Sequence, residues 1–189
     1  MDKASARTLV LPLRRNMDRE EAECRSRIIC RKFIESDEYR NASSILLYKA
    51  YNNEVGTDMI FESALRDRKT VAYPRSRIED GEPVMRFYIV SGTDRFVSGY
   101  KGIPEPCSAC DEMTGRADIC IAPGVAFDSM CHRVGYGKAF YDRFLRENAP
   151  GLVIGLAYDI QIVDSIEPDA DDVTPDMVIT DTQIYASRG

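Results

Sequence analysis

Four short apolar runs, separated by longer amphipathic stretches, constrain the fold of this chain more than any other feature. They are Ser44–Tyr48, Asp118–Ala122, Leu152–Ala157 and Met177–Thr180. Continuous apolar runs of this length are typical of strands that are covered on both faces, as in parallel sheets. Helical stretches between such strands imply right-handed crossover connections. The pattern therefore predicts an α/β fold with a largely parallel central sheet.

Further elements are expected around these runs. Asp18, followed three positions later by Glu21, indicates an acidic capping box at the start of a helix. The expected elements are helices over Met17–Ser36 and Gly56–Arg68 and strands over Thr70–Pro74 and Val84–Val90. The basic stretch before Met17 is expected to be looser, and Ser91–Gly115, rich in Gly, Pro and Ser, is expected to be the least regular part.

Size and charge exclude several classes of protein. A chain of 189 residues suits one domain, spanning residues 1–189. The net charge of −6 argues against a nucleic-acid protein that relies on a broad basic face. No apolar run approaches the roughly 18 residues of a membrane helix, and the first residues do not resemble a signal peptide. We therefore expect a cytoplasmic protein, monomeric or weakly dimeric, with no nucleic-acid or membrane partner.

The six cysteines are too few and too scattered for a disulfide scaffold. Cys107 and Cys110 form a CxxC pair, but no second pair or spaced histidines complete a zinc site. Reduced, partly buried thiols are the favoured interpretation.

A glycine-rich basic segment follows the Asp118–Ala122 run. It contains Arg133, Gly135, Gly137 and Lys138 within six residues, and Asp142 is the only acid between Arg133 and Arg146. Glycines let backbone N–H groups approach an anion, and arginine and lysine side chains suit phosphate oxygens. The residues alone fit phosphate binding and a glycine turn that begins a helix equally well.

An acidic segment lies near the C-terminus. Asp159–Asp181 holds eight acidic residues and no Lys or Arg. A solvated loop is the simpler interpretation. The alternative is that these carboxylates supply one or two ligands to Mg²⁺, which binds substrate phosphates alongside few protein oxygens. A basic glycine loop together with a separate acidic loop favours binding of a magnesium nucleotide.

Two further candidates lie early in the chain. Lys3 and Arg7 are one helical turn apart and could face one anion, although a frayed basic terminus has the same pattern. Glu54 follows the strand that ends near Lys49, and its carboxylate could accept hydrogen bonds from a ligand or begin the next helix.

At these residues the sequence resembles the 5-formyltetrahydrofolate cyclo-ligase (methenyltetrahydrofolate synthetase) family. The most specific part is Pro123-Gly-Val-Ala-Phe-Asp128 followed by Arg133-Val-Gly-Tyr-Gly-Lys-Ala-Phe-Tyr-Asp142. The resemblance runs from Lys3 to about Tyr185, nearly the whole chain. It implies a three-layer α/β/α fold like that of the ribose-phosphate isomerase and CoA-transferase group. It also implies an ATP-dependent conversion of 5-formyltetrahydrofolate to 5,10-methenyltetrahydrofolate, ADP and phosphate, with ATP as co-substrate and Mg²⁺ as cofactor.

The resemblance also assigns roles to residues. Lys138 and Arg133 are implied to be catalytic, because phosphoryl transfer needs alignment and charge neutralisation. The implied ATP-binding residues are Lys3, Arg7, Arg133, Val134, Gly135, Tyr136, Gly137, Lys138, Ala139, Phe140 and Tyr141. The implied substrate-binding residues are Lys49, Glu54, Tyr136, Gly137, Lys138, Ala139 and Phe140. Asp142 and Asp172 are the implied metal ligands.

Departures from the family pattern leave two rival hypotheses open. Ala139 and Cys131 stand where the family commonly has glycine, and Asp171 stands where it often has histidine. A non-catalytic folate- or nucleotide-binding protein on the same fold is the first rival. The second rival is an isomerase-type enzyme that acts on a sugar phosphate, which the acidic loop makes less attractive.

Overall fold

The predicted apolar runs form the centre of one sheet. The computed structural model describes residues 1–99 and 102–187. Residues 100 and 101, in the Ser91–Gly115 region, and residues 188 and 189, at the end of the predicted domain, lie outside the described residues. The central strands are β1 (Ser44–Leu46), β6 (Ile119–Ala122), β9 (Leu152–Leu156) and β11 (Met177–Ile179). Neighbours pair in parallel in the order β11-β9-β6-β1, which confirms the mixed α/β fold with a mostly parallel sheet.

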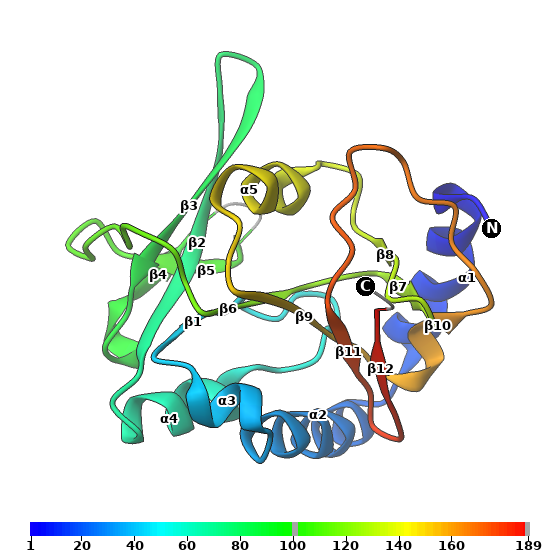
Figure 1. Cartoon of the computed structure of the whole chain (residues 1–189), viewed down its shortest axis with the longest axis horizontal. Coiled ribbons are helices and arrows are strands. Elements are labelled where there is room, and N and C mark those ends of the chain that lie inside the picture. Colours follow the sequence, from blue (N-terminus) through cyan, green and yellow to red (C-terminus); the bar gives the residue numbers. More distant parts are fainter. Residues whose placement is uncertain (100–101, 188–189) are drawn as a thin grey trace.

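The two edges of the seven-stranded sheet differ from its centre. β12 (Ile184–Ala186) pairs antiparallel with β11, and β2 (Thr70–Glu79) continues past the expected end at Pro74 to pair antiparallel with β3 (Glu82–Ile89). Asp80 and Gly81 have φ of 51° and 84°, the signature of a two-residue hairpin turn. The strand predicted over Val84–Val90 therefore exists, but as the return arm of a hairpin that projects from the molecule (Figure 1).

Alternate side chains of the strands face two separate cores. Ile45 packs in the cluster that contains Phe33 and Ile60, whereas Leu46 packs with Phe144. The helices on the first face are α2 (Arg19–Ile34), α3 (Asp37–Asn41) and α4 (Asp58–Arg66), and α5 (Phe140–Asn148) lies on the other (Figure 1). Asp18 caps the N-terminus of α2 as predicted: its side chain accepts a hydrogen bond from the Glu20 N–H at 3.0 Å.

The N-terminal stretch is a regular helix, α1 (Lys3–Asn16), and not the looser segment that we expected. The Asp2 side chain caps it by accepting hydrogen bonds from the backbone N–H groups of Ala4 and Ser5, both at 2.9 Å. α1 packs through Ala6 and Val10 on a small sheet of β7 (Ala126–Asp128), β8 (Arg133–Val134) and β10 (Ile162–Val163). This contact brings the N-terminus to the glycine-rich segment.

The region expected to be irregular contains a short hairpin of β4 (Phe96–Ser98) and β5 (Pro104–Pro106) after the 3-10 turn η1 (Thr93–Arg95). A second 3-10 turn, η3 (Asp159–Gln161), precedes β10. Within residues 1–99 and 102–187, no helix has the length and apolarity that a membrane span requires.

Candidate active site

A buried aspartate shapes the turn that precedes the glycine-rich segment. Asp128 is 1% exposed, and its carboxylate accepts hydrogen bonds from the backbone N–H groups of Met130 and His132, from the His132 ring and from the Ile166 N–H. Cys131, within this turn, has φ of 66°. The turn reverses the chain from β7 into β8 and so places Arg133 on β8, an edge strand of the small sheet.

The glycine-rich segment ends at the N-terminus of α5. Ala139 precedes this helix with φ of 53° and ψ of 14°, and no side chain caps the helix. Gly137 also has a positive φ, 86°. The free N–H groups of a helix N-terminus carry partial positive charge and suit an anion. Gly137 and Ala139 both have the positive φ that glycine adopts most readily, which explains why glycine suits this loop. Ala139 adopts this backbone conformation although it carries a Cβ atom.

The segment lines a cavity of about 870 Å³. All predicted site residues except Val134 line it: Lys3, Arg7, Lys49, Glu54, Arg133, Gly135, Tyr136, Gly137, Lys138, Ala139, Phe140, Tyr141, Asp142 and Asp172. Val134 instead packs with Ala6 and Val10, fully buried, so its side chain is outside the cavity. Another cavity, of about 340 Å³, lies between β3 and α5. None of the predicted lysines and arginines of the site lines it.

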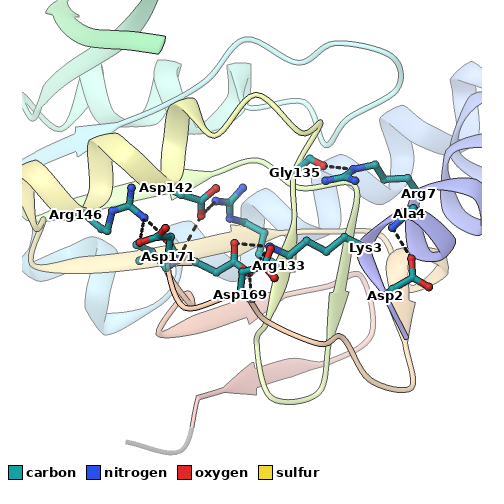
Figure 2. A network of polar contacts seen from close by, with 12 residues as sticks. Asp2, Lys3, Ala4, Arg7, Arg133, Gly135, Asp142, Arg146, Asp169 and Asp171 are labelled. Atoms are coloured by element: carbon teal, nitrogen blue, oxygen red, sulfur yellow. Dashed lines mark hydrogen bonds and ion pairs between the residues drawn. The ribbon is translucent and has the colours of Figure 1, made fainter. Parts of the chain in front are cut away.

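Arg133 and Asp142 form an ion pair in the wall of the cavity. One Arg133 Nη donates to Asp142 Oδ1 at 2.6 Å (Figure 2). The other Nη donates to the Pro123 carbonyl at 3.1 Å. Asp142 Oδ1 also accepts from the Val173 N–H at 3.3 Å, which ties the start of α5 to the acidic segment. The buried Arg133 Nε has no partner among the described residues and leaves a donor for a ligand.

α1 supplies two more cations. The Lys3 ammonium donates to Asp169 at 2.8 Å and to Asp172 Oδ1 at 2.6 Å, and Arg7 donates to the Gly135 carbonyl at 2.7 Å (Figure 2). Burial lowers the pKa of Lys3, but its hydrogen bonds to the two aspartates outweigh this and raise the pKa above its usual value. Lys3 therefore stays charged in the site.

A second wall of the cavity is built around Glu54. The backbone N–H of Tyr51 donates to its carboxylate at 2.9 Å, and burial raises the pKa of Glu54 to about 7, although the nearby Arg14 partly offsets this. Arg14 is fully buried and donates to the carbonyls of Asn52 and Gly124 and to the hydroxyl of Tyr136. Arg14 thus joins α1, the Glu54 loop and the glycine-rich segment.

Lys49 approaches the cavity from the other side. Its ammonium donates to Asp58 at 2.6 Å and lies 4.5 Å from the centre of the Phe96 ring. Lys138 is exposed and has no ion-pair partner among the residues described. It is therefore available to a charged ligand.

Several cavity residues were not predicted as site residues. They are Tyr48, Tyr51, Pro74, Ser76, Ile103, Pro104, Glu105, Pro123, Arg146, Asp169 and Asp171. Arg14 does not line the cavity, but it contacts Tyr136 in the cavity wall and was not predicted either. It follows Ala6 and Val10 at successive intervals of four, which places it on the buried face of α1.

The carboxylates of the cavity fit a substrate-linked Mg²⁺ better than a dedicated metal cage. Within the described chain, no three acidic, histidine or cysteine side chains are grouped to hold a metal. Asp142 and Asp172 line the same cavity as Lys3 and Lys138. Mg²⁺ commonly takes one or two carboxylates and completes its shell with water and phosphate oxygens, so two carboxylates beside two lysine ammonium groups are a suitable donor set for it.

Comparison with known proteins places the chain among folate enzymes. A sequence model of the "5-formyltetrahydrofolate cyclo-ligase family" matches residues 1–181. A Caenorhabditis elegans protein named "Probable 5-formyltetrahydrofolate cyclo-ligase" is 31% identical, with 94% of this chain and 91% of that protein covered. The 5-formyltetrahydrofolate cyclo-ligase of Haemophilus influenzae is 26% identical, with 88% and 91% covered.

Solved structures agree with these relatives. The 5,10-methenyltetrahydrofolate synthetase of Aquifex aeolicus superposes with a TM-score of 0.85 and 29% identity, covering 99% of this chain and 93% of that one. The Mycoplasma pneumoniae enzyme of the same name shares the fold, with a TM-score of 0.74 over 96% of this chain and 99% of the other. On the match over residues 1–181, this chain belongs to the 5-formyltetrahydrofolate cyclo-ligase family.

Proposed function

We propose that this protein converts 5-formyltetrahydrofolate to 5,10-methenyltetrahydrofolate and, in the same reaction, ATP to ADP and phosphate. The observation that carries the proposal is the convergence of Lys3, Arg7 and the Arg133–Asp142 segment on one cavity that also contains Glu54. Family membership names the substrates, and the cavity offers cations for a triphosphate and a carboxyl for the N–H groups of a folate.

The proposed mechanism needs no nucleophile from the protein. ATP phosphorylates the formyl oxygen, which turns a poor leaving group into phosphate, and N10 of the folate then closes on the activated carbon. The task left to the protein is to align the two substrates and to neutralise charge. Arg133, fixed by Asp142 and the Pro123 carbonyl, is suited to hold phosphate oxygens in one orientation. The exposed Lys138 can follow the phosphoryl group as charge develops.

Asp142 and Asp172 are the proposed holders of Mg²⁺, which would neutralise charge on the phosphate oxygens of ATP. Asp142 uses Oδ1 for Arg133 and Val173, and its Oδ2 has no partner among the described residues. Lys3 pairs with Asp172 in this structure, and a bound phosphate offers its ammonium an alternative partner. In the free protein Lys3 and Asp172 thus form an ion pair, and in the complex Lys3 would bind phosphate while Asp172 would bind Mg²⁺.

The Glu54 wall is the proposed folate side of the cavity. A carboxyl with a pKa near 7 exchanges its proton readily at neutral pH, so it can adapt to a ligand that presents N–H donors. Lys49 and Tyr136 lie on the same cavity and are proposed to contact this substrate.

The broader setting is part of the proposal. We assign the fold to the three-layer α/β/α group that includes ribose-phosphate isomerases and CoA-transferases, and we treat residues 1–189 as one catalytic unit, because α1, β8, α5 and the acidic segment all supply cavity residues. We propose a cytoplasmic monomer or weak homodimer without nucleic-acid or membrane partners. The net charge of −6 supports the absence of a nucleic-acid partner.

A spectrophotometric assay of methenyltetrahydrofolate formation, with and without ATP and with ADP measured in parallel, tests the activity. We expect product only when ATP is present and one ADP for each product. If the folded protein binds both ligands in calorimetry without releasing ADP, the non-catalytic binding protein is the correct account. Binding of sugar phosphates without Mg²⁺ and without affinity for folates would instead support the isomerase-type enzyme.

A further inference from the structure

The CxxC pair lies beside the candidate site and takes no part in the proposed reaction. Cys107 follows β5 directly, and β5 with the residue before it supplies Ile103, Pro104 and Glu105 to the cavity wall. The sulfur atoms of Cys107 and Cys110 are 3.7 Å apart, and both cysteines are free thiols that are partly accessible to solvent. Two thiols in contact at a protein surface are placed to react with each other.

The backbone holds the two cysteines at a separation that suits a disulfide. The Cys110 N–H donates to the Cys107 carbonyl at 3.0 Å, which closes a four-residue turn. Such a turn keeps its end Cα atoms within about 7 Å, and disulfides span roughly 4.4–6.8 Å between Cα atoms. Arg75 donates to the carbonyls of Pro106 and Cys107, and the Cys107 N–H donates to the Arg95 carbonyl at 2.7 Å. The turn is therefore anchored on both sides and can accept the bond without unfolding.

The two thiols have unequal reactivity. The Ala109 backbone N–H donates to the Cys107 sulfur and, with the Cys110 thiol and nearby Arg95, holds the pKa of Cys107 below its usual value despite some burial. Burial and the neighbouring Cys107 raise the pKa of Cys110. Since the thiolate is the nucleophile, Cys107 is the attacking sulfur and Cys110 the resolving one.

The three buried thiols of the chain, Cys30, Cys120 and Cys131, do not have a lowered pKa. Burial raises the pKa of Cys30 and of Cys120 to about 12 and that of Cys131 to about 11. Each is buried within a hydrophobic core, where an oxidant has no access. Cys24 is exposed, but no second sulfur accompanies it.

We propose that Cys107 and Cys110 are a redox-active dithiol that hydrogen peroxide converts into an intramolecular disulfide beside the cavity wall. The Cys107 thiolate attacks one peroxide oxygen, the O–O bond breaks, and Cys107 becomes a sulfenic acid while hydroxide leaves. The Cys110 sulfur then attacks the Cys107 sulfur, and the sulfenic oxygen leaves as water. Two thiols lose two electrons, and one peroxide becomes two waters, so no further reactant is needed.

Peroxide titration of the full-length reduced protein tests this inference. The protein is exposed to about one equivalent of hydrogen peroxide, the remaining thiols are alkylated, and peptides are weighed by mass spectrometry. We expect the peptide with Cys107 and Cys110 to lose two hydrogens and to take up no alkyl group, and dithiothreitol to restore both thiols. Cys24, exposed and unpaired, is the internal control and stays alkylated.

Two single variants separate the roles of the sulfurs. Cys110→Ser is expected to stop at a sulfenic acid on Cys107 that dimedone traps, and Cys107→Ser to react about tenfold more slowly because the lowered-pKa thiol is absent. Both positions are partly exposed and serine differs from cysteine by one atom, so both variants are expected to fold. Oxidation of Cys24 as fast as of the pair, or an unchanged oxidation rate in Cys107→Ser, would overturn the proposal. Neither result depends on the folate activity.

Discussion

At the residue scale, the buried carboxyl of Glu54 sets a testable dependence of stability on pH. Burial raises its pKa to about 7 in the folded protein, whereas an unfolded glutamate ionises near 4.5. Between these values the folded state binds more protons than the unfolded state, so the free energy of unfolding falls as pH rises through this window. Above pH 7 the ionised, buried group costs up to about 3 kcal/mol.

Glu54→Gln removes this cost. We expect the variant to be more stable than the wild type at pH 8, by up to about 3 kcal/mol, and the difference to shrink towards pH 4.5. Urea unfolding at pH 5 and pH 8 measures both differences. If the stability difference in favour of Glu54→Gln were larger at pH 5 than at pH 8, the raised pKa of Glu54 would be contradicted.

The backbone at Ala139 carries a second residue-scale prediction. Its φ of 53° is a conformation that a side chain makes costly, and the residue is exposed, so no packing compensates. Ala139→Gly is expected to raise the free energy of unfolding by up to about 1 kcal/mol. Gly137→Ala is the matched control, since Gly137 has φ of 86° and an added Cβ would be 3.6 Å from Arg7, an ordinary contact. We expect Gly137→Ala to lower the free energy of unfolding. A change in the same direction in both variants would contradict the strain at Ala139.

At the scale of secondary-structure elements, α1 is the member that sequence reasoning described least well. The basic stretch before Met17 was expected to be looser, yet it is a regular helix: Pro12 lies on an exposed position, while Ala6 and Val10 are buried. The central strands were predictable because both faces are buried and their apolar runs are unbroken. Pairing direction was harder to predict. The strand over Val84–Val90 was expected, but not its antiparallel pairing with β2, which runs from Ala72 past Pro74 to Glu79.

Arg14 tests whether α1 is part of the site or only covers it. Arg14→Met removes the side-chain donor to the Asn52 carbonyl and one of the two donors to the Gly124 carbonyl, and it removes the cation beside Glu54. We expect a loss of about 3 kcal/mol in the free energy of unfolding and a further rise in the pKa of Glu54. Arg15→Met is the matched control because Arg15 is the exposed neighbour on the same helix, and it is expected to change stability by less than about 0.5 kcal/mol. Equal losses in the two variants would contradict the buried role.

At the scale of the whole molecule, the site exists only because distant segments converge. The glycine-rich segment and the Lys3–Arg7 pair were recognisable in the sequence, since glycines and cations at short spacing point to an anion. The pairing of Arg133 with Asp142, the contact of Arg14 with Tyr136 and the place of Glu105 in the cavity wall depend on packing between α1, β5, β8 and α5. No local sequence pattern encodes that packing. The residues predicted from the sequence therefore include most of the glycine-rich side of the cavity and few of those on the opposite wall.

The acidic segment offers a matched pair for the magnesium proposal. Asp172 is largely buried beside Lys3, whereas its neighbour Asp171 is 88% exposed at its side chain and pairs with Arg146. Asp172→Asn is expected to raise the Mg²⁺ concentration needed for half-maximal activity about tenfold, and Asp171→Asn to leave it nearly unchanged. Titration of activity with Mg²⁺ measures both. Identical requirements in the two variants would remove Asp172 from the metal site.

The central claim is that the cationic loop neutralises the transferring phosphoryl group. The most direct test is the turnover number of Lys138→Ala in the ATP-dependent assay, with Arg15→Ala as a control that removes an exposed cation elsewhere. The account predicts a fall of about 10²–10³ in turnover for Lys138→Ala, with unchanged unfolding, and no change for the control. A Lys138→Ala enzyme that turns over as fast as the wild type would contradict it.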